Sequence, residues 1–297
     1  MHPTIHRILP KKLLSALMYR SARIRQPQIK SLLIRFYMRI TGASLHDAAR
    51  QRIAEYDSLL DFFTRELAPN ARPIYGNETD WICPVDGQIA HIGDIQEGNI
   101  FQIKGHHYAL TDLLTSDYCQ GYENGQATTI YLAPHNYHRI HIPYQANLKR
   151  ARYVPGALNS VSVSLLKHIQ GLFAKNERVI LEFACNDNSD DDFIMVLVGA
   201  VNVGSIETVY HGEITPNGNA TPMELAGSQH VSEKGAEIGR FNLGSTIILI
   251  RKNRQLTWCK SDNETCQLGQ ILATPKDTQR DTPRDTSATH KNHQGLS

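Results

Sequence analysis

A Gly-Ser peptide, Gly244-Ser245, gives the chain a bond that it could cut in itself. A serine hydroxyl attacks the preceding carbonyl most easily where the preceding residue has no side chain and tolerates a strained backbone, as glycine does. The apolar run 246–250 follows at once and predicts a strand that holds Ser245 rigidly. If the bond is cut by elimination rather than by hydrolysis, Ser245 becomes a pyruvoyl group, a carbonyl made from protein. Alone, the dipeptide is a weak signal, because most such pairs form turns.

Two other segments carry side chains that could activate a serine. In Pro84-Val85-Asp86-Gly87, Asp86 offers a carboxylate, although an Asp-Gly pair between apolar segments is also typical of a tight turn. Segment 133–143 holds His135, His138 and His141 between two prolines. Imidazole titrates near neutral pH and is suited to acid–base catalysis. Histidines at this spacing could instead bind zinc, but a zinc site would need a further ligand nearby.

Asp86, one of these histidines and Ser245 together contain the parts of an activated serine. The carboxylate orients the imidazole, the imidazole takes the hydroxyl proton, and the serine oxygen attacks a carbonyl. Ser245 does not belong to a Gly-x-Ser-x-Gly elbow, which positions the nucleophile of many hydrolases. It adjoins the glycine of its own candidate cleavage site instead.

The elements that must position these residues are predominantly strands. Ser44, with Asp47 three residues later, predicts the start of a helix over 44–67, which Pro69 and Pro73 end. Beyond Trp81 the sequence pattern changes to short runs of β-favouring residues separated by Gly, Asn and Pro. We expect strands over 88–92, 127–133, 178–184, 193–203, 206–210 and 246–251, and helices over 110–114 and 161–173. The fold class is therefore α+β, a helical N-terminal part followed by a mostly β body.

The charge of the chain is distributed unevenly between its two ends. Residues 1–46 contain nine of the 31 Lys and Arg and none of the 29 Asp and Glu, which leaves 22 basic against 29 acidic groups beyond them. Apolar residues recur at helical spacing within this basic segment, as in Ile29, Leu32, Leu33, Phe36, Tyr37 and Ile40. This pattern favours a helix lying on an anionic membrane surface over nucleic-acid binding, although the stripe could also pack on the body.

Composition limits the remaining possibilities. Five cysteines without a Cys-x-x-Cys pair argue against a disulfide framework and favour a reducing compartment. We find no signal-like segment and no apolar run long enough to span a bilayer. Residues 274–297 are almost entirely polar, which predicts a disordered tail.

The motifs together resemble the bacterial type of phosphatidylserine decarboxylase, from about Leu59 to about Arg251. The most informative are Pro84-Val85-Asp86-Gly87, Tyr137-His138-Arg139-Ile140-His141-Ile142-Pro143 and Leu243-Gly244-Ser245-Thr246. Further matching segments are 60–67 with 72–74, 104–110, 153–156, 173–179, 204–209 and 234–241. Residues 1–58 and 211–231 match poorly. Any one motif would be unspecific, but their number and order are highly specific.

The resemblance implies a role for each candidate residue. Asp86, His141 and Ser245 would form the self-cleavage triad, and His138 would serve decarboxylation as proton donor or organiser. Cleavage between Gly244 and Ser245 would give a β chain, 1–244, and an α chain, 245–297, that begins with the pyruvoyl cofactor. That group would form a Schiff base with the amine of phosphatidylserine and accept electrons as CO2 leaves, without pyridoxal phosphate or metal.

The same resemblance, with the composition, sets the expected organisation and surroundings. We expect a membrane-associating helical region over 1–70, an antiparallel β catalytic domain over 71–273 and a polar tail over 274–297. The expected partners are phosphatidylserine in the bilayer and an anionic membrane surface, with the protein peripheral on the cytoplasmic side of the cell membrane. The resemblance also implies a homodimer of the cleaved pair. Alternatives are an uncleaved lipid-binding scaffold, a serine hydrolase that keeps its Ser245 hydroxyl, and a pyruvoyl decarboxylase of a soluble amino acid.

Overall fold

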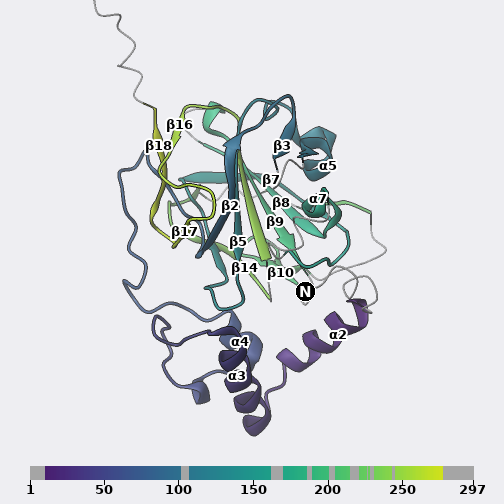
Figure 1. The fold of residues 1–297 in the computed structure, drawn as a ribbon, viewed down its shortest axis with the longest axis vertical. Coiled ribbons are helices and arrows are strands. Elements are labelled where there is room, and N and C mark those ends of the chain that lie inside the picture. The colour runs from purple at the N-terminus through teal and green to yellow at the C-terminus, as the bar shows by residue number, and fades with distance from the viewer. Residues whose placement is uncertain are drawn as a thin grey trace, which may run out of the picture.

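In the computed structural model, the N-terminal helices gather at one end of a body of antiparallel sheets (Figure 1). The structure describes residues 11–101, 107–161, 170–185, 189–200, 205–214, 221–225, 227, 231–242 and 245–276, with side chains from residue 17 onward. Parts of four predictions lie outside these residues: Gly244 of the cleavage site, 162–169 of a predicted helix, 201–203 of a predicted strand, and 277–297 of the tail.

The helices are α2 (Lys11–Ala22), α3 (Pro27–Thr41), α4 (Leu59–Phe63), α5 (Leu110–Leu114) and α7 (Leu172–Lys175), with short 3-10 turns at Ile53–Glu55, Ser116–Tyr118 and Ser189–Asp191. The strands are β1 (Trp81–Ile82), β2 (Gly87–Asp94), β3 (Asn99–Phe101), β4 (His107–Ala109), β5 (Gln126–Leu132), β6 (Arg139–His141), β7 (Ala146–Val154), β8 (Arg178–Ala184), β9 (Phe193–Gly199), β10 (Ile206–Thr208), β11 (Gly212–Ile214), β12 (Met223–Leu225), β13 (Val231–Ser232), β14 (Glu237–Phe241), β15 (Ser245–Arg251), β16 (Leu256–Trp258), β17 (Thr265–Cys266) and β18 (Ile271–Pro275).

A nine-stranded sheet forms the centre of the body. Its order is β12-β7-β8-β9-β15-β5-β2-β17, with β13 also paired to β7, and the neighbouring strands are antiparallel. Strand β15 lies in the middle, and all seven of its residues are buried. A run of Ile and Leu suits a strand covered on both faces, since these side chains pack well on a pleated surface. The predicted antiparallel β body is confirmed.

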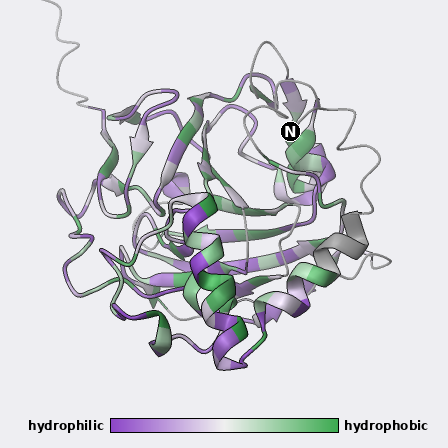
Figure 2. Ribbon diagram, turned by 60° about the horizontal axis from the view of Figure 1, so that its bottom comes forward, coloured by the Kyte–Doolittle hydropathy of each residue, from purple (hydrophilic) through white to green (hydrophobic). Residues whose placement is uncertain are grey.

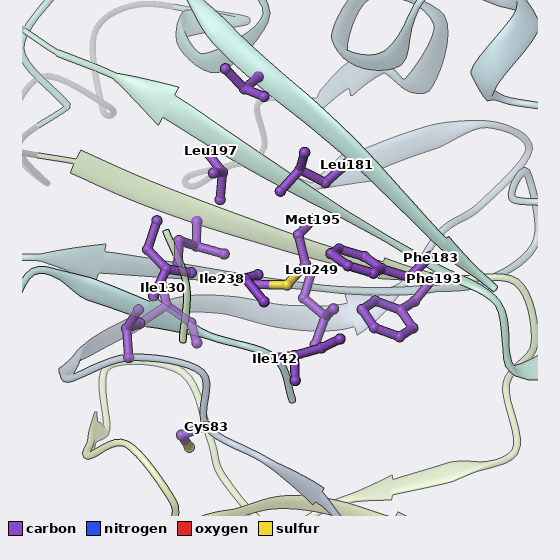
Figure 3. Close-up of a cluster of buried hydrophobic side chains, with 14 of the residues drawn as sticks. Cys83, Ile130, Ile142, Leu181, Phe183, Phe193, Met195, Leu197, Ile238 and Leu249 are labelled. Carbon is purple, nitrogen blue, oxygen red and sulfur yellow. The ribbon is translucent and has the colours of Figure 1, made fainter. Parts of the chain in front are cut away.

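A smaller sheet, ordered β11-β10-β14-β6, shares the main core with one face of the large sheet. Figure 3 shows this core, in which Met195 and Leu249 of the large sheet meet Ile142 and Ile238 of the smaller sheet and its flank. A second core covers the opposite face of the large sheet and includes residues of α5 and α7. Two short sheets, β1-β18-β16 and β3-β4, complete the body.

The N-terminal helices have their own boundaries and their own small core. Pro27 occupies the first turn of α3, the side chain of Gln26 caps it, and Gly42 ends it in a left-handed conformation (φ 78°). Ile34 and Tyr37 of α3 pack in a cluster with Phe62 and Phe63 of α4. Among the described helices, none has the length and apolar character needed to cross a bilayer.

The predicted helix over 44–67 is wrong. The Ser44 hydroxyl caps only a turn by accepting from the His46 amide, and the helix α4 begins later, where Ser58 accepts from the Asp61 amide. The chain doubles back in between, because the Ala49 amide donates to the Glu66 carbonyl at 2.9 Å. These pairings join positions far apart in sequence, and they override the local helical pattern.

Candidate active site

Ser245 is the first residue of β15 and is held on both sides. It pairs with Gly199 of β9 and with Leu132 of β5. Only 1% of the residue is exposed, and its Oγ has no hydrogen-bond partner among the described residues. A buried hydroxyl without a partner is costly, so it indicates a site kept for chemistry rather than for stability.

The segment before Ser245 is also anchored. The Phe241 amide donates to the His138 carbonyl at 3.1 Å, and the buried Asn242 side chain donates to Ser205 Oγ at 2.7 Å. Residues 243–244 lie outside the described residues, so the candidate cleavage bond itself is not described. Its flanks on both sides are firmly placed, as an intramolecular attack requires.

His138 precedes β6 and is completely buried. Its ring stacks on Phe63 of α4, with centroids 4.0 Å apart. Burial, and then the nearby Arg65 cation, lower the pKa of His138 to about 3. The carbonyls of Ala133 and Pro134 favour the charged form, but neither ring nitrogen forms a regular hydrogen bond with a described residue. His138 is therefore a neutral imidazole at physiological pH.

His141 ends β6 and has both ring nitrogens engaged. Nδ1 lies 2.7 Å from the Gly235 carbonyl oxygen, and Nε2 lies 3.0 Å from the Tyr137 hydroxyl. A carbonyl can only accept, so Nδ1 carries the proton and Nε2 of the neutral ring accepts from Tyr137. Burial, the largest influence, lowers the pKa of His141. The ring thus presents a basic Nε2 whose orientation is fixed by a main-chain carbonyl.

Asp86 lies between β1 and β2 and is 5% exposed. Arg72 Nη2 donates to its Oδ2 at 2.7 Å, and the Leu268 amide donates to Oδ1 at 2.9 Å. Arg72 also contacts Asp47 at 3.0 Å, so one guanidinium links the helical end to the body. Burying a carboxylate is costly unless it is paired and hydrogen-bonded in this way.

The structure brings these residues to one end of the sheets without joining them directly. The His141 amide donates to the Pro84 carbonyl, two residues before Asp86, at 2.9 Å. Within the described residues, no hydrogen bond links Asp86 to His141, or either of them to Ser245. The roles assigned to these residues therefore stay predictions. Sequence reasoning missed Arg72, Tyr137 and Gly235 as the immediate partners, because local patterns do not show which side chains and carbonyls meet in the fold.

A polar cleft of about 560 Å³ opens beside Asp86. Arg65, Arg72, His135 and Tyr137 also line it. The three histidines therefore occupy different environments, since His135 is exposed while His138 is buried. Among the described residues, no group of three or more His, Cys, Asp or Glu side chains is arranged to hold a metal ion.

Comparison with known proteins identifies the family. The family model described as phosphatidylserine decarboxylase matches residues 59–274, and a second model, described as PSD, matches residues 4–42. The chain is 42% identical over 247 residues to a phosphatidylserine decarboxylase proenzyme of Methylobacillus flagellatus, which covers 82% of this chain and 86% of the relative. It is 39% identical over 279 residues to the proenzyme of the same name from Bordetella bronchiseptica, covering 91% and 93%. The chain is a decarboxylase that belongs to the phosphatidylserine decarboxylase family.

Proposed function

We propose that this chain cleaves itself between Gly244 and Ser245 and then uses the resulting pyruvoyl group to convert phosphatidylserine into phosphatidylethanolamine and CO2. The proposal rests on Ser245, which is buried at the start of the central strand with no partner for its Oγ among the described residues, in a family whose relatives are named proenzymes. A proenzyme needs a maturation step, and a rigid serine after a glycine supplies one.

In the first step, the chain's own residues move one proton and exchange one bond. His141 Nε2 takes the Ser245 hydroxyl proton once Tyr137 releases it, and the serine oxygen attacks the Gly244 carbonyl carbon. The peptide bond gives way to an ester, and the proton passes to the freed nitrogen. Asp86, held by Arg72, supplies negative charge that favours the protonated imidazole. In the elimination that follows, the His141 imidazole, neutral again, takes the Cα proton of residue 245, a Cα=Cβ double bond forms, and the Cβ–O bond breaks to release the Gly244 carboxylate.

The pyruvoyl group would supply an electrophilic carbonyl for the substrate amine and an electron sink when CO2 leaves. The buried position of residue 245 fits such a group, because the carbonyl would be shielded from bulk water. We assign proton delivery in decarboxylation to His138. In the structure His138 is neutral, so an anionic headgroup beside its ring would raise its pKa and allow the ring to carry the proton.

The helical end supports a membrane location for the proposed reaction. Side chains of Leu32, Phe36 and Ile40 on α3 are between 60% and 66% exposed. Arg35 and Arg39 are exposed on the same helix. Figure 2 brings this end of the molecule forward and shows apolar and polar residues alternating along the helix. An apolar row flanked by cations suits the interface of an anionic leaflet. We propose a peripheral position on the cytoplasmic side of the cell membrane and, by family resemblance, a homodimer.

Activity on a lipid substrate tests the function. Purified protein mixed with phosphatidylserine in detergent micelles should release CO2 and form phosphatidylethanolamine. Ser245→Ala should abolish both products, whereas Ser261→Ala, which changes an exposed serine, should leave them unchanged. Turnover by the Ser245→Ala variant, or turnover of water-soluble serine in place of the lipid, would contradict the proposal.

A further inference from the structure

Glu177 is a buried acid that the proposed mechanism leaves without a role. It immediately precedes β8 and is 2% exposed. Its Oε2 accepts a hydrogen bond from the Tyr153 hydroxyl at 3.1 Å, while its Oε1 has no partner among the described residues. Burying a carboxyl group costs free energy when a single phenol hydroxyl is its hydrogen-bond partner and one oxygen has none among the described residues. This cost indicates a function.

The sheet register places Glu177 in the same row as Ser245. Ser245 pairs with Gly199, and the Gly199 amide donates to the Glu177 carbonyl at 2.8 Å. The Asn176 side chain donates to the Gly199 carbonyl at 2.8 Å and fixes the alignment. Neighbouring antiparallel strands lie about 4.8 Å apart, so Glu177 and Ser245 are two strand spacings apart in this row.

The two side chains also project from the same face. Along each strand, every second residue faces the main core: Val179, Leu181 and Phe183 of β8, Met195 and Leu197 of β9, and Ile247 and Leu249 of β15. Side chains alternate between the faces of a sheet, so Glu177, Gly199 and Ser245 continue these rows on the main-core face. The residue between them is a glycine, which places no side chain between the carboxyl group and residue 245. Both Glu177 Oε1 and Ser245 Oγ lack a described partner on this face.

Glu182 of β8 shows how unusual Glu177 is. It is equally buried, at 2% exposed, but it is paired with both Arg150 and Lys149. Glu177 has no ion-pair partner among the described residues, and burial raises its pKa to about 7. A carboxyl group with that pKa is partly protonated near neutral pH and can give up a proton there.

We propose that Glu177 is the acid that delivers a proton to Cβ of residue 245 during maturation, turning the serine-derived side chain into the pyruvoyl methyl group. This inference rests on the proposed function. After the Gly244 carboxylate leaves, residue 245 has a Cα=Cβ double bond and an amino group on Cα. The double-bond electrons take the Glu177 proton to form the new Cβ–H bond, and the nitrogen lone pair forms a C=N bond. Water then adds to that carbon, ammonia leaves, and the released proton returns to the Glu177 carboxylate.

Two readouts separate this step from chain cleavage. Each precursor is expressed briefly in the cold, desalted to remove free ammonia, and then warmed to start maturation. Cleavage is followed on denaturing gels, and ammonia is measured in the same samples. In the wild type, ammonia should appear with cleavage, one molecule per chain. Glu177→Gln keeps the size and the acceptor for Tyr153 but cannot donate the carboxyl proton. It should cleave at the wild-type rate and release ammonia about a hundredfold more slowly, as is typical of a lost general acid.

Matched variants separate a proton donor from a structural residue. Glu182→Gln removes an equally buried carboxylate from β8, and Tyr153→Phe removes the hydrogen bond but keeps the acid. Both variants should show ammonia following cleavage without a lag. Glu177→Asp retains an acid and should recover part of the ammonia rate. Ammonia keeping pace with cleavage in Glu177→Gln, or failure of that variant to cleave, would overturn the inference. A wild-type chain that neither cleaves nor releases ammonia would instead overturn the proposed function.

Discussion

The central strand β15 and the helix α3 differ in how far their apolar side chains are buried. All seven residues of β15 are buried between two cores, whereas only Ile34 and Tyr37 of α3 are buried and Leu32 and Phe36 stand in water. The sheet body completes its own core and can hold a buried reactive residue rigidly. The helical end leaves an apolar row exposed to solvent. Such a row indicates a surface that another molecule or a membrane covers when the protein is active.

The largest contrast should appear when one leucine is truncated in each region. Leu249→Ala in β15 should lower the free energy of unfolding by about 2–5 kcal/mol, because it leaves a cavity in the main core. Leu32→Ala in α3 should change it by less than about 0.5 kcal/mol, since the side chain is 66% exposed. Urea unfolding measures both, in a Ser245→Ala background that removes the serine of the proposed self-cleavage. Equal losses of unfolding free energy at the two positions would contradict the difference in packing between β15 and α3.

Replacing Arg72, which links the helical end to the sheet body, should lower the stability nearly as much. Arg72 contacts Asp47 on the helical side and Asp86 in the body, with side chains 11% and 8% exposed for Arg72 and Asp86. Arg72→Ala should cost about 3 kcal/mol and slow self-cleavage, because it leaves the Asp86 carboxylate buried without its cation. Arg52→Ala, which removes a surface pair with Glu55, is the matched control and should cost far less than Arg72→Ala. A harmless Arg72→Ala would show that Asp86 is held by other groups.

The exposed row on α3 should matter for membranes rather than for stability. Phe36→Glu should weaken binding to anionic vesicles by about 2 kcal/mol, or about thirtyfold, by removing one buried aromatic side chain from the lipid contact. The same change at Tyr75, which is 52% exposed on the body, should have little effect. Vesicle sedimentation measures both, and activity on micellar substrate should be preserved in both variants. Equal binding by the two variants would remove α3 from the membrane contact.

The last prediction concerns pH, and its effect is the smallest when it is counted per pH unit. Because the pKa of His138 is about 3 in the folded chain, against about 6.5 when unfolded, the unfolded state binds the extra proton between these values. Stability should therefore fall as pH drops through this window, by about 1.4 kcal/mol per pH unit from this group. His138→Gln in the Ser245→Ala background should flatten the slope of unfolding free energy against pH by that amount. An unchanged slope would show that His138 is not buried as a neutral ring.

The sequence allowed the body to be predicted better than the helical end. Runs such as 178–184 and 246–251 are apolar and rich in β-branched residues, and they form β8 and most of β15. The helix predicted over 44–67 failed because backbone pairing between Ala49 and Glu66 folds the segment back on itself. Local periodicity contains no information on such a distant pairing.

The site shows the same limit. The residue types at Asp86, His141 and Ser245 could be read from their motifs. Their immediate partners could not, because Gly235 lies 94 positions from His141, and the Leu268 amide lies 182 positions from Asp86. The apolar stripe on α3 was found by its spacing, but Tyr37 faces the protein instead, and its hydroxyl donates to the Pro134 carbonyl beside the histidine segment.

Intact-mass spectrometry of the purified protein under denaturing conditions tests directly whether the chain cleaves itself to form a pyruvoyl group. We expect two chains, residues 1–244 and 245–297, with the smaller beginning in a pyruvoyl group in place of serine. A single uncut chain of 297 residues, or a small chain that begins with an unmodified serine, would contradict the account.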